Sequence, residues 1–179
     1  MPSVRVKLAA GVAALGIAGI STAAIAHDRA KFQADLNGYE ETPSVSTQGV
    51  GTFRAQINRN ADEIRYSLTY GGQFNGTVTQ AHVHLGQEGV AGGISVWLCT
   101  TPAITAAPAG TQQCPQQGTI TGTIKPADVV GPAGQGIAPG EFAELVQAMR
   151  AGVTYANVHS STQTGGEIRG QIGDGESRD

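Results

Sequence analysis

Short bursts of alternating apolar and polar residues recur along most of the chain. The apolar positions of the first three bursts are Phe32, Ala34 and Leu36, then Phe53, Ala55 and Ile57, then Ile64, Tyr66, Leu68 and Tyr70. A period of two is typical of strands with one face in a core. Further strand candidates cover residues 78–85, 94–98, 118–124, 153–159 and 167–172. The pattern predicts about eight strands separated by turns.

One segment changes to a helical period. Phe142, Leu145, Val146 and Met149 lie at positions i, i+3, i+4 and i+7 before a stop at Gly152. This spacing predicts an amphipathic helix of about three turns. Regularly spaced strands with one helix indicate an all-β, antiparallel sandwich or barrel, and we expect Greek-key connections between the strands.

The first 26 residues have the organisation of an export signal. Arg5 and Lys7 precede an uncharged run that ends in Ala24-Ile25-Ala26, a small-x-small pattern that a signal peptidase recognises. An uncleaved membrane anchor is the alternative, but the run is rich in Ala and Gly and is weakly apolar. We expect cleavage after Ala26, which leaves one domain of residues 27–179, secreted or periplasmic and not attached to the membrane.

Composition narrows the classes of function. Of 179 residues, 26 are Gly and 8 are Pro, which favours short elements over long helices. The 11 basic and 14 acidic side chains give a net charge of −3, so the chain has no basic field for a nucleic acid, and we expect no such partner.

The chain has two cysteines, Cys99 and Cys114. An exported chain with two thiols usually oxidises them, so we expect a disulfide that closes the Pro- and Gln-rich excursion of residues 100–117. The alternative, a pair of thiolates that binds metal or exchanges electrons, has the wrong spacing.

Three histidines lie in predicted strands and provide the main candidate chemistry. His82 and His84 share one face of their strand because they are two residues apart, and His159 projects from its strand on the side of Asn157. If the two strands are neighbours, the three imidazoles meet and form a possible copper or zinc site. The alternative is that these rings only hydrogen bond to loops over a polar face of the sheet.

Other polar residues could support this site. Asn157 or Glu167 could hold an imidazole N–H and fix its tautomer, and Arg169 could attract an anion. Glu167 and Arg169 could equally form a surface ion pair. Glu41 lies in a turn-rich segment and is expected to be solvated.

His27 is a separate candidate. Cleavage after Ala26 would make it the N-terminal residue, whose amine and ring nitrogen together could chelate copper. A chain end with an incidental histidine is the alternative.

Four segments together resemble the CHRD domain, named from chordin and also found in microbial exported proteins. They are Leu36-Asn37-Gly38-Tyr39-Glu40-Glu41-Thr42-Pro43, Ala81-His82-Val83-His84-Leu85-Gly86, Tyr155-Ala156-Asn157-Val158-His159 and Gly166-Glu167-Ile168-Arg169-Gly170-Gln171-Ile172. Glu41-Thr42-Pro43 departs from the family's usual Val-Pro-Pro. The resemblance spans nearly all of the mature chain and implies an extracellular interaction module whose partner is an unknown protein.

A weaker resemblance is to the copper-zinc superoxide dismutase fold. His82-Val83-His84 is similar to its paired copper ligands, Val158-His159 to a later copper ligand, and the segment of Arg169 to the strand with its guiding arginine. The zinc-site and bridging histidines have no counterpart, which puts catalysis in doubt more than copper binding.

Three hypotheses follow from the sequence. The first is an exported CHRD-type binding module with a copper ion on His82, His84 and His159. The second is a copper redox enzyme of the superoxide dismutase type, in which Arg169 steers the anion. The third is a metal-free extracellular interaction or matrix protein with structural histidines. The sequence favours a binding protein over an enzyme.

Overall fold

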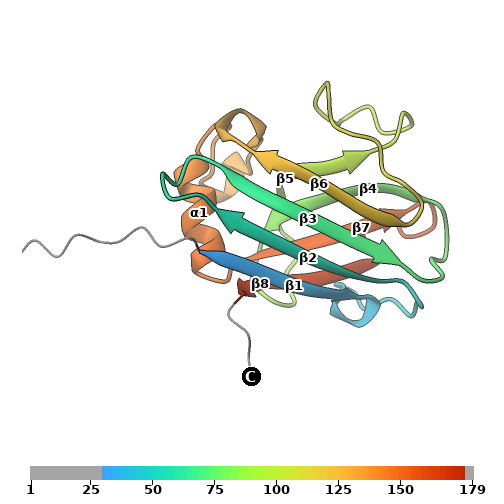
Figure 1. Cartoon of the computed structure of the whole chain (residues 1–179). Coiled ribbons are helices and arrows are strands. Elements are labelled where there is room, and N and C mark those ends of the chain that lie inside the picture. The colour runs from blue at the N-terminus through green and yellow to red at the C-terminus, as the bar shows by residue number, and fades with distance from the viewer. Residues whose placement is uncertain (1–29, 176–179) are drawn as a thin grey trace, which may run out of the picture.

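Eight antiparallel strands form one strongly curved sheet in the computed structural model, which describes residues 30–175 (Figure 1). The strands are β1 (Lys31–Asn37), β2 (Val50–Ile57), β3 (Ile64–Gly71), β4 (Val78–Leu85), β5 (Gly93–Thr100), β6 (Gly118–Ile124), β7 (Thr154–Ser160) and β8 (Ile168–Asp174). Their order in the sheet is β5-β4-β7-β8-β1-β2-β3-β6. The expected export signal and His27 lie outside the described residues.

The two end strands of the sheet, β5 and β6, meet at a seam that nearly closes the barrel. Gln112 spans this seam, because its Nε2 donates to the carbonyl oxygen of Leu98 in β5 at 3.1 Å and to that of Thr121 in β6 at 3.2 Å. The hydroxyl of Tyr66 also donates to Leu98 O. With β7 beside β4 and β6 beside β5 across the seam, the expected Greek-key barrel is confirmed.

The predicted alternation is also confirmed in the core. Inward residues of β1, β2 and β3 are buried at the positions that the pattern indicated, and the remaining strands complete one apolar interior. Buried examples are Phe32, Leu36, Phe53, Ile57, Ile64, Leu68, Val83, Val158, Ile168 and Ile172.

Helix α1 (Phe142–Arg150) covers one end of the barrel (Figure 1). It has 9 residues, somewhat fewer than expected, and its predicted stripe is buried. The described part of the chain also contains three short 3₁₀ helices: η1 (Gly38–Glu40), η2 (Pro126–Asp128) and η3 (Ala133–Gln135). Among residues 30–175, no helix has the length and hydropathy needed to cross a membrane.

The expected disulfide joins Cys99, at the end of β5, to Cys114. It closes the excursion that projects beside β5 and β6, and backbone hydrogen bonds between Thr100 and residues Gln112 and Cys114 continue the same connection. The cross-link therefore fixes the segment that delivers Gln112 to the seam.

The double substitution Cys99→Ser/Cys114→Ser tests the contribution of this cross-link. Because the sequence separation is 15, its loss should lower the free energy of unfolding by about 3 kcal/mol. Urea unfolding of both proteins provides the measurement, and a reducing agent should destabilise the wild type while leaving the double variant unchanged. Equal stability of the two oxidised proteins would contradict the expectation.

Candidate metal site

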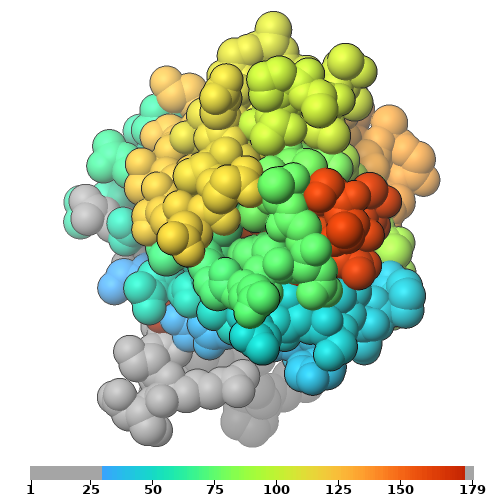
Figure 2. Space-filling view, turned by 90° about the vertical axis from the view of Figure 1, so that its right-hand side faces the viewer, coloured from blue at the N-terminus to red at the C-terminus, as the bar shows by residue number. Residues whose placement is uncertain are grey.

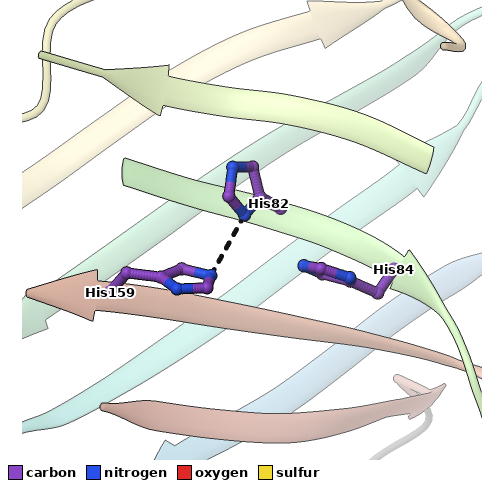
Figure 3. A group of neighbouring side chains, drawn as sticks. All are labelled: His82, His84 and His159. Carbon is purple, nitrogen blue, oxygen red and sulfur yellow. Dashed lines mark hydrogen bonds between the residues drawn. The ribbon is translucent and has the colours of Figure 1, made fainter. Parts of the chain in front are cut away.

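The three strand histidines meet on the outer face of the sheet. Strand β4 pairs with β7, so that His82 lies opposite Asn157 and Gln80 opposite His159. His82 and His84 project from β4 on the side away from the core residues Ala81 and Val83. The expectation that two distant segments bring these rings together is confirmed in the arrangement of the strands (Figure 3).

The ring nitrogens converge on one space. Nδ1 of His82 lies 3.2 Å from Nε2 of His159, and His84 points its ring edge toward both (Figure 3). One nitrogen from each of the three rings lies within 4.8 Å of the others. Two imidazoles on one ion with bonds of about 2 Å have their nitrogens roughly 3 to 4 Å apart, so a small adjustment of the rings would let the cluster hold a metal.

Backbone carbonyls fix two of the rings. Nδ1 of His84 lies 2.9 Å from the carbonyl oxygen of Gly92, and Nδ1 of His159 lies 2.9 Å from that of Thr164. A carbonyl accepts only from a protonated nitrogen, so in both rings Nδ1 carries the proton and the Nε2 lone pair is left for a ligand. A partner of this kind on the far nitrogen is the usual way to orient a metal-binding histidine.

Asn157 completes the polar surroundings. Its Oδ1 lies 3.1 Å from Nε2 of His159, so an uncharged polar atom stands beside the cluster. Because Nδ1 of His159 carries the proton, this oxygen receives no N–H from the ring. The predicted role of fixing an imidazole tautomer is filled by the carbonyls of Gly92 and Thr164 and not by Asn157.

All three imidazoles are buried. The exposed fraction is 1% for His82, 7% for His84 and 6% for His159. Burial lowers the pKa of His82 to about 2, and repulsion from His159 and His84 adds to this effect. Burial also lowers the pKa of His84 to about 4 and lowers the pKa of His159. The imidazoles are therefore neutral and can act as metal ligands. Nε2 of His82 and Nε2 of His84 have no hydrogen-bond partner.

Aromatic rings pack against the cluster. The indole of Trp97 lies edge-on to His82 with ring centroids 4.3 Å apart, and Tyr155 stacks on His84 at 4.8 Å. The alternation had placed Tyr155 on this face, but no sequence pattern singled out Trp97. Its position opposite His82 depends on register shifts between β4 and β5.

Arg169 secures a loop over this face. Its guanidinium lies 3.4 Å above the ring of Tyr155, and its two terminal nitrogens donate to the carbonyl oxygens of Val90 and Gln87 at 3.0 Å each. Arg169 is 2% exposed. The expected roles in attracting an anion or forming a surface ion pair do not fit this burial, because both terminal nitrogens hold the backbone of the loop.

Glu167 ties together loops at the other end of the barrel. Its Oε1 accepts from the hydroxyl of Thr47 at 2.6 Å and from the backbone N–H of Asn75 at 2.5 Å. Figure 2 shows the segments around these residues packed beside the one that follows β7. Glu167 is fully buried and acts on loops rather than on an imidazole, which corrects its possible role as a ring partner.

Glu41 is a buried carboxylate that the sequence placed in solvent. Its exposed fraction is 7%, and its carboxylate packs against Gly166, where a side chain would overlap it. Burial raises the pKa of Glu41 to about 7, although the charge of Arg169 opposes this effect. The expectation of a solvated Glu41 is wrong because the loop folds back onto β8, and the only indication was its place in a segment that carries the family resemblance.

The fold and the site define an all-β barrel domain with a buried cluster of three histidines. The family model for the CHRD domain matches residues 32–172, and the chain belongs to this family. No curated protein and no solved structure matches the chain. The resemblance to superoxide dismutases is supported by none of these comparisons.

Acid should destabilise the metal-free protein. The folded pKa values of the three histidines lie below the usual 6.5, so the unfolded chain binds protons first as the pH falls. Each imidazole that stays neutral then costs about 1.4 kcal/mol per pH unit below pH 6.5. Urea unfolding between pH 7 and pH 5 in the presence of a chelator should show this loss, and His159→Gln should flatten the slope. A slope unchanged by this substitution would contradict the assignment.

The contribution of Glu41 to stability should depend on pH in the opposite direction to that of the histidines. Its folded pKa of about 7 lies above the ordinary 4.5, so its contribution to stability is present below pH 4.5 and is lost as the pH rises through 7. The free energy of unfolding of Glu41→Gln, relative to wild type, should therefore rise by about 2 to 3 kcal/mol between pH 5 and pH 8. Glu40→Gln, at an exposed neighbour, is the matched control and should show no such trend.

Proposed function

We propose that this CHRD domain is an exported binding module that holds one transition-metal ion, with copper as the first candidate, through His82, His84 and His159. The observation that carries this proposal is the convergence of three buried imidazole rings, each with one nitrogen directed into a shared space. Imidazole suits copper and zinc. In addition, burying these rings is costly, since Nε2 of His82 and Nε2 of His84 have no hydrogen-bond partner.

Export is part of the proposal. The disulfide between Cys99 and Cys114 fits a protein that matures in an oxidising compartment. The leader-like residues 1–26 and the extracellular setting that the family resemblance implies point the same way. We further propose that such a module binds an extracellular protein, as chordin does.

The redox-enzyme alternative has less support than binding. Its guiding residue would be Arg169, whose guanidinium is buried and bonded to backbone carbonyls. A superoxide assay on the copper-loaded protein tests this alternative directly. A rate above that of copper bound to an unrelated protein would favour the enzyme.

Titration with copper should quench the fluorescence of Trp97, the one tryptophan of the chain, because its indole is in contact with His82. We expect one equivalent to bind at this site. His82→Gln, His84→Gln and His159→Gln should each weaken binding by at least about a hundredfold, since each removes one ligand.

His27→Ala is the control for this titration. If His27 forms an N-terminal chelate, the substitution removes a second equivalent of copper without changing the quenching of Trp97. Urea unfolding of each variant establishes that it is folded. Affinity and stoichiometry unchanged in all three strand-histidine variants would refute the site.

A further inference from the structure

We propose that the cluster of His82, His84 and His159 is suited to a monovalent cuprous ion rather than to a divalent ion such as zinc or cupric copper. This inference rests on the proposed metal-binding function and adds the charge of the ion. Three features carry it: the neutrality of the ligands, their burial and the fixed cation beside them.

The ligands bring no charge that would compensate an ion. Among residues 30–175, the group of histidine, cysteine and acidic side chains that could share one ion here consists of the three histidines. The further polar atom beside His159 Nε2 is Oδ1 of Asn157, which is also uncharged. An ion in this space would keep its full charge.

Burial makes that charge expensive. The rings are at most 7% exposed, and the loop over them is held in place by Arg169. In a continuum description the cost of moving an ion out of water grows with the square of its charge, so a divalent ion pays about four times the cost of a monovalent one. A neutral, buried ligand set therefore discriminates by charge.

A permanent cation stands close to the cluster. The guanidinium of Arg169 covers one side of the Tyr155 ring, and Tyr155 stacks on His84. Glu41 offsets this cation only in part, because burial keeps its carboxyl partly protonated near neutral pH. Oε1 of Glu167 is bonded to Thr47 and Asn75, and Glu167 is not among the side chains that could share the ion. The remaining positive field repels a divalent ion twice as strongly as a monovalent one.

The spacing of the ring nitrogens permits either ion. Nitrogens at about 2 Å from one ion lie roughly 3.3 Å apart around a tetrahedral ion and roughly 3.5 Å apart around a planar one, so the 3.2 Å between His82 Nδ1 and His159 Nε2 does not separate the two geometries. Zinc sites usually require four ligands. Here three histidines are the candidate ligands, and the neighbouring amide oxygen of Asn157 is a weak ligand for a closed zinc site.

The test compares ions on the exported protein with its disulfide intact, in the His27→Ala background. Competition with chromogenic chelators, under anaerobic conditions for cuprous copper, gives the affinity for cuprous copper and for zinc. We expect cuprous copper to bind at least about a hundredfold more tightly than zinc. The reduction potential of the bound copper should also lie above that of copper in water.

Asn157→Asp adds one negative charge beside the ligands without changing the shape of the side chain. It should shift the preference toward zinc by at least about tenfold and lower the reduction potential of bound copper. Asn60→Asp adds the same charge at an exposed turn and should change neither quantity. If Asn157→Asp does not fold, Glu41→Gln provides the opposite test, because loss of this carboxylate should strengthen the cuprous preference.

The outcomes separate the two proposals. Zinc binding as tight as cuprous binding, with quenching or competition that depends on the three histidines, would overturn the cuprous preference and keep the metal site. Failure of every ion to bind in a histidine-dependent manner would overturn the metal site itself.

Discussion

Burial of polar side chains on the outer face of the sheet is the constraint on which the site depends. Three imidazoles, an amide and a guanidinium lie there under loops, in surroundings where an unpaired polar group is costly. Arg169 meets this constraint by giving its N–H groups to the carbonyls of Val90 and Gln87 and its flat face to Tyr155. Arg169, for which the sequence suggested a role in attracting an anion, therefore has a structural role: it holds the loop that lies over the histidines.

The ring of Tyr155 connects Arg169 to the candidate ligand His84. Tyr155 lies between Arg169 and His84, and its hydroxyl accepts from the N–H of Gly92, whose own carbonyl holds Nδ1 of His84. The loop, the stack and the imidazole therefore form one closed arrangement. A cluster held in this way keeps its nitrogens preorganised, so binding an ion requires little rearrangement.

Much of the fold and part of the candidate site could be predicted from the sequence, because these features depend on local periodicity. Alternation located the strands, the i, i+2 spacing placed His82 and His84 on one face, and the cysteine count gave the disulfide. The burial of Glu41 could not be predicted, because it results from a loop that folds onto a distant strand. The contact of Trp97 with His82 likewise depends on irregular pairing of β4 and β5, which alternation does not encode.

The disulfide has a second structural role at the seam between β5 and β6, in addition to restricting the unfolded chain. The edges of β5 and β6 face one another there, and the amide of Gln112, two residues from Cys114, bonds to a backbone carbonyl of each. Open edges are templates onto which a strand of another molecule can add. By holding the segment of Gln112 in place, oxidation of the thiols therefore helps to keep this seam covered against the addition of a foreign strand.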